Sequence, residues 1–358
     1  MALWVLLLLS ALLLPMGFLG KRITRAVLSN LLTWLGLLCM GLGSSLFVLA
    51  LLREVALLVA QGFDWLWPSV FPIVPLTSFR VDTALMVPVL GLLVTLWGFS
   101  NARRTAAVVR VDVPIANLPA ALQGFQIAQI SDIHLGPTIK GPYLQRIVAR
   151  VNSLDADLVA ITGDLVDGSV AELRGDVMPL TALVSTHGTF FVTGNHEYYS
   201  GVHGWIDTLR ALGIRVLMNE HVLIHHNRDT QDPEQAIMAV AGVTDFSAHH
   251  FDETHRSDPA RAMNGVPAEA VFRLLLAHQP RSATAAMQAG FDLQLSGHTH
   301  GGQFWPWNHF VRWQQPFTAG LHQWQSMWIY TSRGTGYWGP PKRLGAPSEI
   351  TLLRLVRV

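Results

Sequence analysis

The sequence predicts an α/β domain that follows an α-helical transmembrane region. Two observations carry this prediction. Residues 1–100 contain five Lys or Arg and three Asp or Glu, while all 15 histidines lie in the remainder of the chain. Beyond residue 105, strand-like apolar runs alternate with helix-like segments, as they do in α/β folds. The overall values, 50% hydrophobic residues and a mean hydropathy of +0.33, therefore average an apolar third with a polar, His-rich domain.

The apolar third contains three stretches without a charged residue, near residues 2–20, 26–52 and 83–100. Each approaches the roughly 20 residues that a helix needs to cross a hydrocarbon core of about 30 Å. We therefore predict a transmembrane anchor region over residues 1–104 with about three helices. Residues 55–75 are apolar and rich in Trp and Pro. They read as an interfacial stretch or as a fourth span.

A cleaved signal peptide is the alternative for the first stretch. No basic segment precedes it, no clear cleavage site follows it, and two more apolar runs come later, so anchoring is favoured. Basic residues cluster after the first and third stretches: Lys21, Arg22, Arg25, Arg103, Arg104 and Arg110. The positive-inside rule places both clusters in the cytoplasm. We expect a multi-pass protein of the inner or plasma membrane with a cytoplasmic polar domain; a fourth span would reverse that side.

The polar part begins with a linker and a first strand over residues 105–123, and the main domain follows over residues 124–358. Nine strands are predicted at Phe125–Ser131, Leu158–Thr162, Phe190–Thr193, Ile214–Met218, Ile237–Val243, Phe272–Ala277, Leu293–Ser296, Trp328–Ser332 and Ile350–Leu355. Several of these runs are apolar almost throughout, as expected for strands buried on both faces. Helices are predicted at Pro142–Val151, Val177–Ser185, Trp205–Leu212 and Ser282–Ala289. Residues 226–235 and 248–268 are polar and read as loops or a small cap.

Charge and cysteine content disfavour two classes of protein. The formal net charge is +1, and the polar domain has no basic excess, whereas a nucleic-acid-binding domain usually has one. A long nucleic-acid substrate is therefore disfavoured. The single cysteine, Cys39, lies inside an apolar run, so neither an intrachain disulfide nor a thiolate zinc site can form.

Five short polar strings follow apolar runs in the second half of the chain: Asp132-Ile133-His134, Gly163-Asp164, Gly194-Asn195-His196-Glu197, His278 and Gly297-His298-Thr299-His300. At a strand end, residues i and i+2 point to the same side, so Asp132 and His134 can reach one ion. Taken singly, most strings have a plain alternative: a chance Asp-x-His, an Asp-Gly turn, a structural histidine or a Gly-rich loop. Five in order, each at a strand end, indicate one shared site.

Counting donor atoms gives two ligand sets that share one carboxylate. The first set is Asp132, His134, Asp164 and His300; the second is Asp164, Asn195, His278 and His298. Imidazole and oxygen ligands without thiolate suit two divalent ions such as Mn, Zn or Fe. Two ions about 3.5–4 Å apart can bind a bridging hydroxide and clamp phosphate oxygens. His196, beside Asn195, is placed to act as a proton donor rather than as a ligand.

With these strings the chain resembles the calcineurin-like metallophosphoesterase superfamily, whose pattern is D-x-H, GD-x-x-D, GNH[D/E], H and GH-x-H. The resemblance covers residues 124–356. The longer motif Gly297–Gln303, with Ser332–Gly334 and Pro347–Ile350, looks most like the YkuE/YaeI-type branch, which commonly has an N-terminal membrane anchor or export signal. The resemblance implies a four-layer α/β/β/α sandwich of two mixed sheets with helices outside.

The resemblance also implies roles for individual residues. The two ligand sets would hold the first and the second metal ion, His196 would protonate the leaving group, and Asp167 would orient His196. A bridging hydroxide would attack the phosphorus of a phosphomonoester or phosphodiester. From its position alone, Asp167 is equally well read as a surface turn residue.

The substrate is less well defined by the sequence. Aromatic residues run around and after the His-x-His string: Phe304, Trp305, Trp307, Phe310, Trp313, Phe317, Trp324, Trp328, Tyr337 and Trp338. Cap or core packing explains most of them, whereas an apolar groove beside the metals would, together with the anchor, favour a lipid-linked substrate. Arg333 and Arg343 are candidates for binding phosphate, with surface salt bridges as the alternative. Two other functions stay open: a membrane-anchored metal-binding scaffold or adaptor without turnover, and a nuclease or nucleotide phosphodiesterase.

Overall fold

The computed structural model of the chain describes residues 2–20, 23, 25–67, 76–227 and 236–358. It divides into two compact units: residues up to Arg103 together with Gly339–Leu344, and Arg104–Trp338 together with Gly345–Val358. Several residues used above lie outside the described ones: Lys21, Arg22, residues 68–75 of the Trp- and Pro-rich stretch, and residues 228–235 of the predicted loop.

The first unit is helical. Its helices are α1 (Ala2–Leu13), α2 (Met16–Leu19), α3 (Ala26–Leu66) and α4 (Leu76–Arg103). Two stretches, Val27–Leu66 and Ser78–Arg103, are long and apolar enough to cross a membrane. α1 has 12 residues, about 18 Å at 1.5 Å per residue, which is short of a hydrocarbon core of about 30 Å.

The helical unit differs from the predicted pattern in two places. The first predicted span is divided into α1 and α2, because Pro15 precedes α2 and does not continue α1. Helix α3 runs on to Leu66, so the first part of the predicted interfacial stretch is helical. Ser45 and Thr95 lie with their hydroxyl oxygens 3.1 Å apart, and Arg53 donates to the Thr83 hydroxyl at 3.1 Å. Polar contacts thus join α3 to α4.

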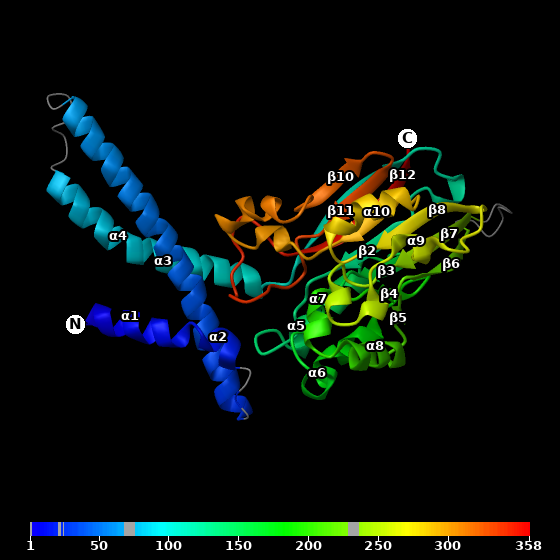
Figure 1. The fold of residues 1–358 in the computed structure, drawn as a ribbon, viewed down its shortest axis with the longest axis horizontal. Coiled ribbons are helices and arrows are strands. Elements are labelled where there is room, and N and C mark those ends of the chain that lie inside the picture. The colour runs from blue at the N-terminus through cyan, green and yellow to red at the C-terminus, as the bar shows by residue number, and fades with distance from the viewer. Residues whose placement is uncertain (1, 21–22, 24, 68–75, 228–235) are drawn as a thin grey trace. The chain divides into compact units, whose positions relative to one another are not determined.

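The second unit contains two six-stranded mixed sheets (Figure 1). The first sheet has the order β1 (Ala107–Ile115), β12 (Glu349–Arg357), β2 (Gln126–Ile130), β3 (Leu158–Ile161), β4 (Thr189–Phe191) and β5 (Arg215–Val216). The second has the order β10 (Gly320–Trp324), β11 (Met327–Thr331), β9 (Leu293–Ser296), β8 (Ala270–Leu276), β7 (Ala236–Gly242) and β6 (Glu220–His226). Strands β2 to β5 are mutually parallel, as are β7, β8, β9 and β11.

The core lies between the two sheets. Ile127 and Leu158 of the first sheet share one apolar cluster with Leu274 and Leu276 of the second. Leu275, which points to the opposite face because side chains alternate along a strand, packs in another cluster with Ala283. Helices therefore cover the outer face of the second sheet. They are α9 (Pro259–Met263) and α10 (Ala283–Gln288).

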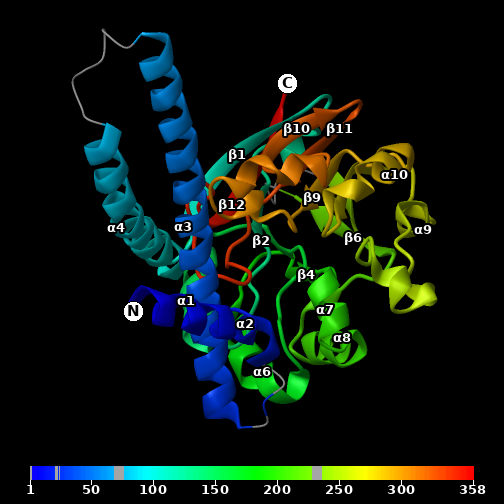
Figure 2. The ribbon, with the colours of Figure 1, turned by 60° about the vertical axis from the view of Figure 1, so that its left-hand side comes forward.

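The remaining helices follow strands of the first sheet in the chain. They are α5 (Gly141–Asn152), α6 (Val170–Val177), α7 (Asn195–Tyr199) and α8 (Val202–Ala211). Figure 2 shows α6, α7 and α8 gathered on one side of the domain. The predicted four-layer arrangement of two sheets with helices outside is confirmed.

All nine predicted strands are present within a few residues of their expected bounds. Two further strands, β6 and β10, were not predicted. Each lies at a sheet edge, pairs with one neighbour and is partly exposed, so neither has a continuous apolar run. The predicted helix Val177–Ser185 was wrong. The helix there is α6, which ends at Val177, and the 3₁₀-helix η3 (Met178–Ala182) follows it.

Candidate metal centre

The five polar strings meet at the carboxyl ends of parallel strands from both sheets. Asp132 follows β2, Asp164 follows β3, and Asn195 opens α7 after β4. His278 follows β8, and the His-x-His string follows β9. Parallel strands end at the same edge, so loops that are distant in sequence converge there. Asp132 is fully buried, and Asp164, His278 and His300 are at least nine-tenths buried.

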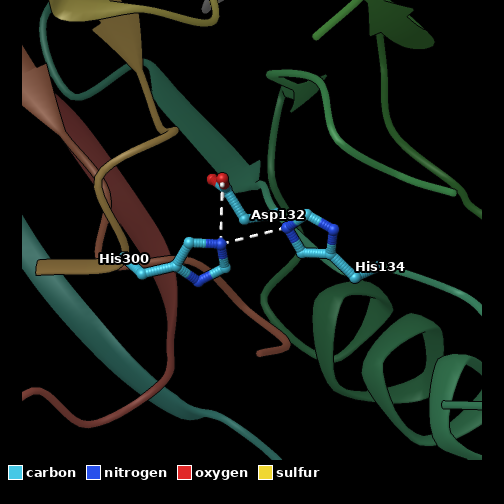
Figure 3. A group of neighbouring side chains, drawn as sticks. All are labelled: Asp132, His134 and His300. Carbon is cyan, nitrogen blue, oxygen red and sulfur yellow. Dashed lines mark hydrogen bonds and ion pairs between the residues drawn. The ribbon is translucent and has the colours of Figure 1, made fainter. Parts of the chain in front are cut away.

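The first group contains Asp132, His134 and His300 (Figure 3). The Nε2 atoms of the two histidines lie 3.0 Å apart, and His300 Nε2 lies 3.5 Å from Asp132 Oδ1. One ligand atom from each residue lies within 4.8 Å of the other two. Three residues predicted for the first metal ion are therefore within reach of one point.

The second group contains Asp164, His278 and His298. His278 Nε2 lies 3.1 Å from Asp164 Oδ2 and 3.2 Å from His298 Nδ1. Asp164 Oδ2 also lies 3.9 Å from His134 Nε2, in the first group. Asp164 thus stands between the groups, where a shared carboxylate was predicted.

Asn195 supports the fit of this donor set to cations. Its Oδ1 atom is buried and has no hydrogen-bond partner among the described residues, and an unsatisfied buried oxygen of this kind is costly. Imidazole nitrogens and carboxylate oxygens that converge without thiolate suit divalent Mn, Fe or Zn. His278 Nδ1 donates to the Thr162 carbonyl at 2.7 Å, which leaves Nε2 available as a ligand.

The chain adopts an uncommon backbone conformation at five of the seven predicted ligands. Positive φ angles occur at Asp132, His134, Asp164, His298 and His300, with values from 51° to 70°. This region is uncommon for residues with a side chain and is found at sites where the surrounding structure enforces it. Two backbone bonds hold it here, because Asp132 N donates to Gly163 O at 3.0 Å and His134 N donates to Asp164 O at 3.1 Å.

Glu197 organises the centre, a role that the sequence reasoning missed. It is fully buried, and its Oε2 accepts the N–H groups of Gly194 at 2.7 Å and Asp164 at 2.9 Å. Its Oε1 accepts those of Leu165 at 2.8 Å and Val166 at 3.3 Å. One side chain thereby joins the loop after β3 to the start of α7. The signal in the sequence was a glutamate three residues after Gly194, at the N3 position of α7, from which its side chain can accept the N-cap N–H.

Asp167 bridges two histidines through one oxygen. His196 Nδ1 lies 2.5 Å and His134 Nδ1 lies 3.0 Å from Asp167 Oδ1. Although burial opposes ionisation, the charges and hydrogen bonds of these two histidines hold the pKa of Asp167 far below its usual range. Its side chain is 13% exposed, so it is partly buried in the site rather than fully exposed in a turn. The contact to His134 was not predicted.

His196 sits between the carboxylates of Asp164 and Asp167. Burial alone would lower its pKa, but the charge of Asp164 and the hydrogen bond that His196 donates to Asp167 raise the pKa to about 9. His196 Nε2 lies 3.9 Å from Asp164 Oδ2, and the ring also falls in a group with His134 and Asp164. It can therefore carry a proton toward the centre or stand near a cation.

Burial and charge act differently on the remaining groups. Burial raises the pKa of Asp132. At Asp164 burial is outweighed by the charges of His278 and His196, which hold its pKa well below the usual range. Burial, followed by the charge of His278, lowers the pKa of His298 to about 3, so this ring is neutral at pH 7, as a ligand must be.

Comparisons with known proteins identify the family of the chain. The family described as Calcineurin-like phosphoesterase matches residues 125–302. A Danio rerio protein named "Transmembrane protein with metallophosphoesterase domain" is 37% identical over 330 residues, which cover 89% of this chain and 73% of that protein. The chain belongs to the calcineurin-like phosphoesterases.

Two further relatives are similar to this chain. The Bos taurus protein of the same name is 41% identical over 75% of this chain and 62% of its own length. The Bacillus subtilis "Uncharacterized metallophosphoesterase YkuE" is 28% identical over 66% of this chain and 81% of its own length.

Membership of this family identifies the chain as a phosphoesterase, a hydrolase of phosphate esters. Relatives named as transmembrane proteins, with the two apolar helices described above, indicate association with a membrane. The family generally uses divalent metals, and the groups around Asp164 are suited to hold them.

The two arginines predicted to bind phosphate lie in different units. Arg333 belongs to the phosphoesterase unit, where its Nη1 donates to Glu349 at 2.8 Å and its side chain is about one-third exposed. Arg343 belongs to the helical unit. There its backbone N–H donates to Gly98, its carbonyl accepts from Asn101, and its side chain is buried. Phosphate binding by Arg343 stays a prediction.

The aromatic residues divide into a packed set and an exposed set. Tyr337 is buried, and Phe317 and Trp324 pack against the cluster under α10. The exposed members are Trp305, Trp307, Phe310, Trp313 and Trp338. Trp338 lies with its ring centroid 6.0 Å from that of His196, and Tyr199 lies 5.2 Å away on another side. Exposed aromatic rings therefore border the predicted proton donor.

Proposed function

We propose that this phosphoesterase hydrolyses phosphomonoester or phosphodiester bonds at a dinuclear metal centre. Asp132, His134, Asp164 and His300 would hold one divalent cation, and Asp164, Asn195, His278 and His298 would hold the other. The observation that carries the proposal is the convergence of two largely buried three-residue groups on Asp164, which lies within 3.9 Å of a histidine in each group.

When bound, the two cations would activate the attacking water and neutralise charge on the phosphate oxygens. The protein groups then have separate tasks. Asp167 holds the Nδ1–H side of His196, so that Nε2 faces the reacting centre. His196 in its protonated form donates a proton from Nε2 to the departing oxygen. General acid catalysis of this kind typically raises the rate about 10²–10⁴-fold. Asp132 and His278 are themselves almost fully buried.

The reaction class is tested with full-length protein in detergent on aryl phosphate monoesters and diesters with Mn²⁺, Zn²⁺ or Mg²⁺. We expect metal-dependent turnover in the wild type and none in Asp164→Asn, which loses the shared charge. Asp112→Asn is the matched control, because Asp112 forms an exposed pair with Arg354 on an edge strand. Equal turnover in Asp164→Asn and wild type would refute the assignment. Metal binding without turnover in the wild type would favour the scaffold alternative.

The role of His196 is tested by varying the leaving group. His196→Ala should slow hydrolysis of an alkyl phosphate far more than that of a nitrophenyl phosphate, because a nitrophenolate leaves without needing a proton. His225→Ala, at an exposed histidine on β6, should leave both rates unchanged. An equal loss on both substrates would show that His196 does not act as the proton donor.

For the substrate we propose a phosphate ester with an apolar, lipid-like leaving group. The support is the exposed aromatic border formed by Tyr199 and Trp338 beside His196, together with the apolar helices. Trp338→Ala should raise KM for a detergent-dispersed lipid phosphate and leave KM for glycerol phosphate unchanged. Trp313→Ala is the control, since Trp313 is 73% exposed. A clear preference of the wild type for soluble nucleotides would refute the lipid proposal and favour the nucleotide phosphodiesterase alternative.

For the topology we propose a multi-pass protein of the inner or plasma membrane with the phosphoesterase unit in the cytoplasm. The support is the basic residues that flank the apolar helices, among them Arg25, Arg103 and Arg104. Cysteine labelling of intact cells at an exposed position of the phosphoesterase unit tests the side. Labelling of Val184→Cys by a membrane-impermeant reagent before lysis would contradict a cytoplasmic location.

A further inference from the structure

A second cluster of metal-ligating side chains lies in the phosphoesterase unit and shares no residue with the centre described above. His203 lies in the first turn of α8, and His255 is the last residue of the 3₁₀-helix η5 (Glu253–His255), which Asp252 caps. His203 Nε2 lies 3.5 Å and His255 Nε2 lies 3.8 Å from Asp252 Oδ2. One ligand atom from each residue lies within 4.8 Å of the other two.

These separations fit an ion better than they fit hydrogen bonds. A nitrogen–oxygen hydrogen bond spans about 2.7–3.2 Å, so both Nε2–Oδ2 distances are too long. Zinc binds imidazole nitrogen and carboxylate oxygen at about 2.0–2.2 Å in a tetrahedron, which places neighbouring ligand atoms about 3.4 Å apart. The two measured distances lie close to that spacing.

Neighbouring contacts orient each ligand atom toward the shared point. Asp252 Oδ1 accepts the Thr254 N–H at 3.0 Å and the Thr254 hydroxyl at 2.6 Å, which leaves Oδ2 to face the histidines. The Tyr198 hydroxyl lies 3.1 Å from His255 Nδ1, so that Nε2 is the ring atom on the Asp252 side. Metal-bound histidines commonly have such outer partners.

The cluster also has room for a further ligand. An open hollow of about 300 Å³ is lined by His203 and His255 and by residues that include Asp207 and Arg210. Asp207 lies one helical turn after His203 on α8, on the same face. A fourth coordination position would therefore open on this hollow, where water or an anion beside Arg210 can enter.

We propose that His203, Asp252 and His255 form a third metal site, which binds Zn²⁺ and is separate from the phosphoesterase centre. The ion ties α8 to the segment that contains η5. Through Tyr198 it also restrains α7, the helix that carries Asn195 and His196. Three protein ligands with one open position are typical of zinc sites that exchange a water or substrate ligand.

The test is the zinc content of full-length protein in detergent, loaded with Zn²⁺ near pH 7.5 and freed of excess metal. Elemental analysis should find one zinc per chain fewer in H203A/H255A than in the wild type. H249A/H250A is the matched control and should keep the wild-type content. His249 and His250 also have neighbouring rings, 4.0 Å apart, but lie in no three-residue ligand group of the described part of the chain. Wild-type zinc content in H203A/H255A would overturn the proposal.

The variant Asp252→Asn distinguishes loss of zinc through a missing ligand from loss of zinc through misfolding. Asparagine keeps the size of Asp252 and can still accept from Thr254, but it removes the charge that faces the histidines. We expect the same loss of one zinc with an unchanged circular dichroism spectrum. A native spectrum with full zinc content in D252N would also overturn the site. Because the readout is a metal count, failure of the proposed phosphoesterase turnover would leave this result unaffected.

Discussion

Gly163 offers a way to separate backbone strain from steric damage to the metal centre. Its φ is +87°, and an alanine Cβ there would lie 2.7 Å from Gly194 N and 2.7 Å from His278 Nδ1. Gly188 has almost the same conformation, with φ of +86°, yet the same methyl group would meet no described atom within 4 Å. Alanine at the two positions therefore shares the conformational cost, and only Gly163→Ala adds a steric one.

The expected magnitudes follow from these two terms. A left-handed alanine costs about 1–2 kcal/mol, and overpacking at a rigid contact costs about 1–3 kcal/mol more. In a domain of this size each kcal/mol lowers Tm by about 2–4 °C. Gly188→Ala should therefore lower Tm by about 2–8 °C, and Gly163→Ala by about 2–12 °C beyond that. Because His278 must shift in Gly163→Ala, its metal-dependent turnover per folded molecule should fall about 100-fold.

The assay combines thermal unfolding of full-length protein in detergent, with and without a chelator, with hydrolysis of a nitrophenyl phosphate below the unfolding range. Turnover per folded molecule should be unchanged in Gly188→Ala. Equal Tm shifts in the two variants, or undiminished turnover in Gly163→Ala, would refute the packing that we describe between the loops after β3, β4 and β8.

Three further outcomes are expected. Glu197→Gln replaces one acceptor oxygen of a buried carboxylate that receives four N–H groups, so it should lower the free energy of unfolding by about 2–4 kcal/mol. Glu172→Gln, at an exposed cap of α6, should cost less than about 1 kcal/mol, and equal costs would contradict the role of Glu197. Asp167→Asn should lower kcat with little change in KM, since it loosens His196 rather than substrate binding, and a pure KM effect would contradict this. A chelator should abolish turnover and lower Tm, and Mn²⁺ or Zn²⁺ should restore both; activity that survives metal removal would exclude a metal-dependent reaction.

The sequence by itself indicated the strands and most of the polar strings of the site. Continuous apolar runs such as Leu158–Ile161 mark strands covered on both faces, because burial on both faces removes the alternation of polar and apolar residues. A polar residue directly after such a run, such as Asp132 or Asp164, stands out against it. Edge strands such as β6 escaped prediction, because one exposed side leaves no uniform pattern.

Tertiary structure decided which of these residues meet. His134 and His300 are 166 positions apart in the sequence. The parallel order of strands within each sheet and the packing of the two sheets nevertheless bring their Nε2 atoms to within 3.0 Å of each other. In the folded chain Glu197 also accepts hydrogen bonds from four backbone N–H groups, and Asp167 contacts His134 as well as His196.

The division has a physical reason. Periodicity and strand-end residues are local properties, set by side-chain alternation and turn chemistry over a few positions. Convergence depends on strand order, on the hand of the connections and on which faces pack together, and all of these are global. The sequence therefore determined which carboxylate, imidazole and amide groups this phosphoesterase has as possible metal ligands. Only the fold decided that Glu197 joins the loop after β3 to the start of α7, and that His203, Asp252 and His255 come together outside the predicted centre.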